Sequence, residues 1–426
     1  MFTETRLTQG VRLYVRRTEQ FKTLTFSIRF KQPLTAEGAS ERAVLANILE
    51  DSTEAYPSRS ALRQALEGMY GTLYYTDVGK RGGYHYLSVN AECVDDRLIR
   101  DEDITDWTVR LLADAVLRPN LEDGVFKQQI FEREKQTVLE RVRSIYDDKT
   151  RYAQQRLLTL MRPDGPESIR ATGEEVFLEA LTPEKVMEAY RRMTSEDEIE
   201  IYVVGAVDEE AITASLKEAF RFEGRVPAVQ PEKADRGTGR EGRVSEKQNM
   251  KQGKLHIGFS TPVMFGTADF PKMQLANGIF GGFPHSKLFM NVREKESMAY
   301  YAASSYLSRY GLITVSAGID ADLADKATKL IDEQLAAMRA GEITDTELSQ
   351  TKAMLANQLR EALDSSRGQI EIFDQYKDLP GGFTPEGWIA KWEPVTADDI
   401  REMAGKIDRQ LVYLLSGKEE SADEKA

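Results

Sequence analysis

Arg293 and Tyr300, seven positions apart, are the side chains of this sequence best suited to bind one polar ligand. A guanidinium and a phenol both donate hydrogen bonds, so together they can hold a peptide carbonyl or a developing oxyanion. The alternative is structural: Arg293 pairs with a surface acid, and Tyr300 is a half-buried aromatic residue of a strand. From the spacing alone, the structural interpretation is favoured.

The pair lies at a predicted corner between a short helix and a strand. Two glycines and a proline end the preceding helix, and Ser286 can cap the next one. That short helix has apolar residues at helical spacing, so it has one side to bury. A strand is predicted from about Met298, with Tyr300, Ala302 and Ser304 on one face. The corner is therefore expected to bring the guanidinium and the phenol to the same side.

The composition indicates an ordinary globular protein of two to four domains, with 426 residues, 41% hydrophobic and 30% charged. A net charge of −13 argues against nucleic acid or an anionic membrane as a partner. The start, MFTETRLTQG, has neither the basic region nor the apolar run of a secretory signal. The single cysteine, Cys93, allows no internal disulfide, and we expect a cytoplasmic protein.

The second half of the sequence repeats the pattern of the first. Each half has alternating strands, two long helices, and a final helix followed by a strand. The matching segments are 23–30 with 255–263, 87–93 with 313–319, and 181–205 with 395–417. We therefore predict an α+β fold made of two homologous α/β sandwich domains that arose by internal duplication.

The domain boundaries follow from a change in composition between the halves. We predict an N-terminal domain at 1–222, a linker at 223–250 and a C-terminal domain at 251–426. The linker combines prolines, glycines and many charges, which is typical of a connector. A functional glycine-bearing loop is the alternative for this stretch.

The segment around Arg293 resembles the C-terminal signature of the pitrilysin/insulinase family of zinc peptidases. The shared pattern is GG-x-x-x-S-K-L-F-x-x-V-R-E-K-x-x-x-A-Y. The resemblance implies that Arg293 and Tyr300 hold the substrate backbone at a zinc site built by a different domain. It extends from about Leu7 to Gly417 and is to the two-domain branch. In that branch, two subunits close like a clam shell around an unfolded peptide.

The same resemblance implies an H-x-x-E-H zinc motif in the N-terminal half, and this sequence lacks it. The equivalent helix places Asn47, Glu50 and Asp51 at the His, Glu and His positions. The position of the general base thus keeps its glutamate, whereas both imidazole ligands are missing. Because an amide is a poor neutral ligand for zinc, the motif is degenerate.

The family's last zinc ligand comes from a later helix, which resembles the segment EREKQTVLERVR. Counting from Glu134 places the ligand position on Arg141, with Glu140 one residue off. A cation in a zinc site is repulsive, so we expect no metal and no cofactor in this chain. A hard-ion site at Glu50, Asp51 and Glu140 is the alternative, but it lacks the usual spacing.

The sequence gives little support for any other kind of catalytic or metal site. His85, His256 and His285 are the only histidines, and no two of them stand at i and i+4. Each is therefore expected to be an ordinary strand or loop residue rather than a metal ligand. No G-x-S-x-G nucleophile motif and no G-x-x-x-x-G-K-[ST] phosphate loop occurs.

The pattern as a whole predicts the non-catalytic subunit of a zinc peptidase. Arg293 and Tyr300 are expected to serve the zinc site of a homologous H-x-x-E-H partner, with a peptide as substrate. Zinc is expected only in that partner, and no nucleic acid or membrane is expected as a partner. The alternatives are a stand-alone peptide-binding protein, a structural subunit of a larger assembly, and a peptidase with unorthodox ligands.

Overall fold

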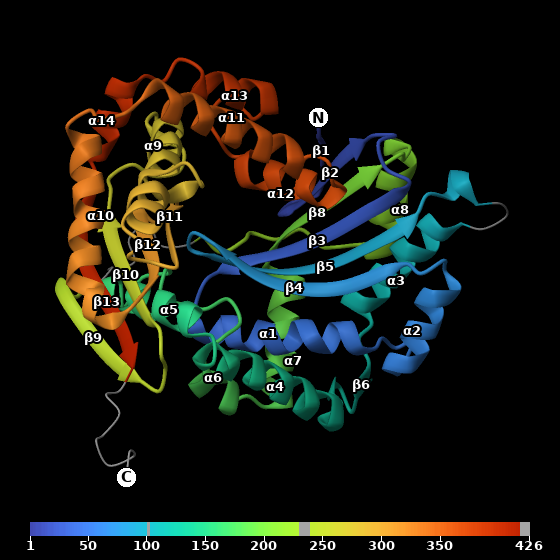
Figure 1. The fold of residues 1–426 in the computed structure, drawn as a ribbon. Coiled ribbons are helices and arrows are strands. Elements are labelled where there is room, and N and C mark those ends of the chain that lie inside the picture. Colours follow the sequence, from blue (N-terminus) through green and yellow to red (C-terminus); the bar gives the residue numbers. More distant parts are fainter. Residues whose placement is uncertain (100–102, 230–238, 418–426) are drawn as a thin grey trace, which may run out of the picture. The chain divides into compact units, whose positions relative to one another are not determined.

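The computed structural model describes residues 1–99, 103–229 and 239–417 (Figure 1). Contacts within the chain divide it into two compact units. Unit 1 contains most of the first half of the sequence together with Asp364–Asp374. Unit 2 contains most of the second half together with Ile145–Ser168. Each unit therefore takes one segment from the other half of the sequence, which the predicted boundaries at 222 and 251 do not include.

Unit 1 is built on a six-stranded sheet with the strand order β1-β2-β8-β3-β5-β4. Only β2 and β8 run parallel; all other neighbours are antiparallel. The strands are β1 (Thr3–Thr8), β2 (Val11–Arg17), β3 (Thr23–Pro33), β4 (Leu73–Arg81), β5 (Tyr84–Val94) and β8 (Glu198–Gly205). β1 was not predicted from the sequence, because its side chains are mostly exposed and do not alternate.

Helices cover one face of this sheet, and their apolar sides form the main core with it (Figure 1). They are α1 (Ala36–Asp51), α2 (Arg59–Gly68), α3 (Ile104–Leu117), α4 (Gln128–Arg143), α6 (Glu175–Glu179), α7 (Pro183–Glu196) and α8 (Glu209–Phe220). The remaining short elements of this unit are η1 (Asp96–Leu98), β6 (Leu121–Glu122) and β7 (Val125–Phe126). Ser58 caps α2 by accepting a hydrogen bond from the backbone N–H of Ala61.

Alternation along β8 shows that the sheet of unit 1 is covered on both faces. Ile201 and Val203 belong to the main core beneath the helices. Tyr202 and Val204, which point the other way, pack against Ile370 of α12 (Ser366–Tyr376). This explains why β8 is buried along nearly its whole length.

A buried ionic cluster also fastens α12 to this sheet. Arg29 of β3, of whose side chain only 8% is exposed, donates to Asp374 over 2.6 Å. Arg81 pairs with the same carboxylate, and the Tyr202 hydroxyl donates to it over 2.8 Å. Glu371 pairs with both arginines at the more exposed side. The carboxylate of Asp374 is thus fully compensated despite its burial.

Unit 2 is built on a five-stranded sheet with the order β11-β12-β10-β13-β9, in which β13 and β9 run parallel. The strands are β9 (Gly242–Gln248), β10 (Gly253–Ser260), β11 (Tyr301–Leu307), β12 (Leu312–Ile319) and β13 (Asp408–Gly417). The helices are α5 (Lys149–Met161), α9 (Phe270–Asn277), α10 (Ala324–Arg339), α11 (Asp345–Ala362), α13 (Pro385–Trp392) and α14 (Ala397–Gly405). Short turns of other helix types are η2 (Ser144–Tyr146), η3 (Gly278–Gly282), η4 (Leu288–Lys295) and η5 (Ala321–Leu323), of which η3 and η4 are π-helical. Within the described ranges, no helix combines the length and the apolar character needed to cross a bilayer.

Helix α5 packs on the sheet of unit 2 through a small apolar cluster. Leu157 and Met161 of α5 contact Leu411 and Tyr413 of β13. Gly258 of β10 permits this approach, because a Cβ there would lie 2.0 Å from the sulfur of Met161. The glycine is thus required by the close passage of the helix and not by a turn.

The two sheets confirm the predicted duplication. The order β2-β8-β3-β5-β4 in unit 1 has the same connectivity and directions as β9-β13-β10-β12-β11 in unit 2. The α+β class and the two homologous domains are therefore as predicted. β9 lies inside the predicted linker 223–250, which was not expected. It was missed because it is a polar edge strand with mostly exposed side chains; residues 230–238 of that linker lie outside the described ranges.

Candidate functional site

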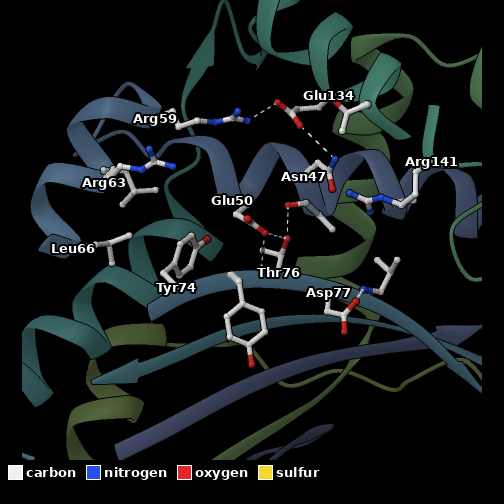
Figure 2. Close-up of a pocket in the computed structure, with 16 residues that line it drawn as sticks. Asn47, Glu50, Arg59, Arg63, Leu66, Tyr74, Thr76, Asp77, Glu134 and Arg141 are labelled. Atoms are coloured by element: carbon white, nitrogen blue, oxygen red, sulfur yellow. Dashed lines mark hydrogen bonds and ion pairs between the residues drawn. The ribbon is translucent and has the colours of Figure 1, made fainter. Parts of the chain in front are cut away.

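A pocket of about 570 Å³ lies in unit 1 between α1, α2, α4 and β4 (Figure 2). Helix α1 contributes Asn47 and Glu50, and α4 contributes Glu134 and Arg141. Three of the four degenerate positions predicted from the sequence therefore line one cavity. The fourth, Asp51, is buried at the end of α1.

Two buried carboxylates beside this pocket are held by arginines. Asp51 accepts a hydrogen bond from Arg59 Nε at 2.9 Å and pairs with Arg133. Glu134 accepts from Arg59 Nη2 at 2.8 Å and from Arg133 Nε at 2.7 Å. The amide of Asn47 adds a third donor to Glu134 at 3.3 Å. Hydrogen bonding to Glu134 raises the pKa of Arg133 above its ordinary value. The two acids and two guanidiniums thus neutralise each other in a closed network.

Glu50, at the predicted position of the general base, is an exposed residue that caps the edge of the sheet. One of its oxygens accepts from the backbone N–H of Thr76 at 2.8 Å and from the Thr76 hydroxyl at 3.0 Å. The same hydroxyl lies 2.8 Å from the carbonyl oxygen of Ala46, so its single proton is shared between the two acceptors. Because β4 is an edge strand, its outward N–H groups need such a partner.

Two arginines of the pocket have no partner among the residues that the structure describes. Within the described ranges, the guanidiniums of Arg63 and Arg141 make neither a hydrogen bond nor an ion pair. Figure 2 shows the Arg141 side chain extending from α4 toward Asn47 on α1. A positive group therefore stands next to the positions where the sequence resemblance implies zinc ligands.

The backbone around Arg293 and Tyr300 differs from the predicted corner. Helix η4 carries Arg293 near its end, and Ser297 then adopts a left-handed conformation with φ of +49°. This turn delays the strand, so β11 begins at Tyr301 and not near Met298. Tyr300 therefore does not share the face of Ala302 and Ser304, which are buried.

Both side chains of this corner reach solvent. The Arg293 side chain is 40% exposed, lies 4.5 Å above the Phe289 ring and is 3.5 Å from Glu294. Tyr300 is 64% exposed, and its backbone N–H donates to Gly318 at 2.8 Å. Its hydroxyl makes no hydrogen bond within the described part of the chain, including to Arg293. The predicted convergence of the two groups on one ligand atom stays a prediction.

Comparison with known proteins identifies the family. Over 412 residues, 96% of each chain, the sequence is 34% identical to a Bacillus subtilis (strain 168) protein named Probable inactive metalloprotease YmfF. This chain belongs to the M16 peptidase family. Residues 180–355 match the family described as Peptidase M16 inactive domain. The resemblance to the pitrilysin/insulinase peptidases is thereby confirmed, and the chain is an inactive M16 homologue.

Solved structures agree with this assignment. A conserved protein from Enterococcus faecalis V583 has a TM-score of 0.91 and 32% sequence identity, covering 99% of both chains. A peptidase M16 inactive domain from Pseudomonas fluorescens has a TM-score of 0.78 and 16% identity, covering 98% of both chains. The second similarity shows the shared fold alone.

The zinc ion that the M16 fold implies does not fit the residues present. Asn47 offers an amide whose nitrogen already donates to Glu134. Asp51 is occupied by two guanidiniums, and Arg141 brings a further positive charge to the pocket. Zinc requires anionic or imidazole ligands in a tetrahedral set, and a dication beside these arginines is repelled. The structure therefore supports no step that passes through a metal in this chain.

The alternative metal sets are not assembled either. In residues 1–99, 103–229 and 239–417, no group of three or more His, Cys, Asp or Glu side chains could hold a metal ion. Glu140 accepts from its helical neighbour Gln136 and does not line the pocket. The hard-ion site at Glu50, Asp51 and Glu140 is thus not formed.

The histidines are structural residues. His85 is buried, its Nε2 lies 2.9 Å from the carbonyl oxygen of Ala171, and burial lowers its pKa to about 3. His256 is buried with its Nδ1 3.1 Å from Gln154 Oε1, and burial lowers its pKa to about 4. His285 contacts a threonine hydroxyl at 2.8 Å.

Several residues of the pocket were not predicted as site residues. Glu134 was not itself predicted as a site residue. It lies seven positions before Arg141, and this spacing places both residues on one face of α4. That spacing is the signal that pointed to it. Arg59 and Arg133 carry no such signal, because nothing in the local pattern links them to Asp51.

Proposed function

We propose that this chain is the non-catalytic subunit of an M16 zinc peptidase. In this proposal Arg293 and Tyr300 bind the substrate backbone at the zinc site of an H-x-x-E-H partner. The observation that supports this proposal is a difference between the degenerate zinc motif and the corner that contains Arg293 and Tyr300. The carboxylates of Asp51 and Glu134, at and beside the degenerate zinc motif, are bound by this chain's own arginines, whereas the Tyr300 hydroxyl has no hydrogen-bond partner in the described ranges.

Peptide hydrolysis at zinc divides naturally between two chains. The partner's metal would polarise the scissile carbonyl and activate water. This chain would supply donors for the oxyanion, and those donors can come from another subunit if closure places them within hydrogen-bonding distance. The exposed guanidinium and phenol have the chemistry of such donors. A cytoplasmic place of action is part of the proposal.

The decisive experiment compares three preparations on an unfolded peptide: this chain, an M16 homologue with H-x-x-E-H from the same source, and their 1:1 mixture. Cleavage confined to the mixture, or strongly increased by it, is expected. The matched control is a mixture made with the Arg293→Ala, Tyr300→Phe double variant. A zinc-bearing homologue that is fully active alone and gains nothing from this chain would exclude the proposal.

A second candidate is a stand-alone peptide-binding protein, favoured by the open pocket at the degenerate motif. Affinity purification under native conditions discriminates the two candidates. A subunit should bring down an H-x-x-E-H protein in stoichiometric amount, and a stand-alone binder should not.

A further inference from the structure

The pocket at the degenerate metal motif has the properties of an anion site. Arg63 of α2 and Arg141 of α4 both line the cavity of about 570 Å³. Neither guanidinium has an ion-pair or hydrogen-bond partner in the described ranges. We propose that these two arginines bind the C-terminal carboxylate of a peptide that enters this pocket. The proposal needs no partner subunit and does not rest on Arg293 or Tyr300.

The acids around the pocket do not compete for these two cations. Asp51 and Glu134 are neutralised by other arginines, as described above. Glu50 is engaged by the backbone and hydroxyl of Thr76. Asp77 accepts from the N–H of Val78 at 2.9 Å and lies 3.5 Å from Arg367. A carboxylate ligand can therefore form charge-assisted bonds with the guanidinium of Arg63 or of Arg141 without displacing an ion pair within the described ranges.

The edge strand favours a chain end over a peptide that passes through. A peptide that adds a strand to β4 needs the outward N–H groups of that edge. Glu50 occupies the N–H of Thr76 in the middle of the part of β4 that lines the pocket. Strand addition across this point is blocked, whereas the terminus of a chain can enter without using that N–H.

The wall of the pocket favours a carboxylate at a chain end over a phosphate group. The donors are two side-chain guanidiniums from separate helices, and guanidiniums bind either anion. The wall also contains Leu62, Leu66 and Val78, which suit an apolar last side chain. We therefore assign the ligand as a peptide ending in an apolar residue with a free carboxylate.

The test measures binding of two short fluorescent peptides that end in leucine, one as the free acid and one as the carboxamide. Fluorescence anisotropy of the full chain should show the acid binding at least about tenfold more tightly, since a charge-assisted hydrogen bond is lost in the amide. Arg63→Ala and Arg141→Ala should each weaken binding of the free-acid peptide by about tenfold or more. Neither should change binding of the carboxamide peptide. Arg141→Lys should recover part of the loss, because it keeps the charge without the planar fork.

The matched control is Arg17→Ala, at the end of β2, which removes an exposed arginine that has no ion pair in the described ranges and is not among the residues that line the pocket. It should bind the acid like the unaltered chain. Equal affinity for acid and amide would overturn the proposal. So would acid binding that survives both pocket substitutions. If inorganic phosphate or acetate displaced the peptide and bound as tightly as the peptide does, the pocket would be a generic anion site. That result would overturn the assignment to peptide termini.

Discussion

Glu50 Oε2 lies 2.8 Å from the backbone nitrogen of Thr76, so the residue at the position of a peptidase base holds the edge of a sheet. A general base must be free to take a proton from water. Here both donors to the carboxylate come from one residue of β4. The surviving glutamate of the motif therefore has a structural explanation in this chain.

The first prediction concerns that carboxylate. Glu50→Ala should lower the free energy of unfolding by about 1 kcal/mol, because it removes partly exposed hydrogen bonds. It should leave turnover of the 1:1 mixture unchanged. Urea unfolding and the peptide assay measure the two effects, with Thr76→Val as the control that removes one donor. A loss of turnover of about a hundredfold or more would instead indicate a catalytic base.

The second prediction concerns metal content. The chain purified without chelator should contain far less than one zinc per molecule by elemental analysis, and chelator should not change its unfolding temperature. The combined change Asn47→His, Asp51→His and Arg141→Glu should be needed before zinc is retained. That variant should also be less stable by about 1 kcal/mol, because two half-exposed arginines lose their hydrogen bonds to Asp51 and keep those to Glu134. Stoichiometric zinc in the natural chain would contradict the structural account of the pocket.

The third prediction concerns the Arg293 and Tyr300 corner. Arg293→Ala and Tyr300→Phe should change the free energy of unfolding by no more than about 0.5 kcal/mol, because both side chains are exposed. Each should lower turnover of the mixture about 10²-fold to 10³-fold, the usual effect of removing one oxyanion donor. Met290→Ala, a neighbouring exposed residue of η4, is the control. Misfolding of either variant would support a structural role instead.

The fourth prediction concerns the attachment of α12 to the sheet of unit 1. Asp374→Asn should destabilise the protein by about 3–5 kcal/mol, because it removes the buried negative charge that pairs with the buried Arg29 guanidinium. Glu371→Gln is the matched change on the same helix. Since its side chain is 45% exposed, its loss should cost less than about 1 kcal/mol. Equal effects in denaturant unfolding would show that burial does not decide the strength of this cluster.

The fifth prediction is a pH dependence set by two buried histidines. The pKa of His85 is lowered to about 3 and that of His256 to about 4, both by burial. Both imidazoles therefore take up a proton near pH 6.5 in the unfolded chain but remain neutral at that pH in the folded chain. The contribution of these histidines to the free energy of unfolding should be fully present above about pH 6.5. It should fall as the pH drops toward 4, by at most about 1.4 kcal/mol per pH unit for each histidine.

Denaturant unfolding at several pH values between about 7 and 5 tests this dependence. In that range the ordinary carboxylates do not yet titrate. His85→Gln and His256→Gln should each flatten the slope. His285→Gln is the control, because its side chain is less buried. An unchanged slope in both buried variants would show that other groups set the pH dependence.

The sequence by itself determined the order of elements and the family. Periodicity located most of the helices and strands, since a residue's neighbours at i+2 or i+4 decide which face it occupies. The repeat between segments such as 23–30 and 255–263 predicted the duplication that the two strand orders confirm. Residue types at Asn47, Asp51 and Arg141 were enough to predict that zinc does not fit.

Only the tertiary structure decided what replaced the metal site. Arg59 and Arg133 lie on two different helices, and nothing in their local pattern indicates that both reach Asp51 and Glu134. Sequence patterns also did not predict that Asp364–Asp374 belongs to unit 1 or that the polar segment of β9 forms a strand. Such contacts join residues that are distant in sequence, and they depend on how the whole chain folds back rather than on local spacing. Among the residues that the structure describes, the guanidiniums of Arg63 and Arg141 stay unpaired after that long-range pairing is complete.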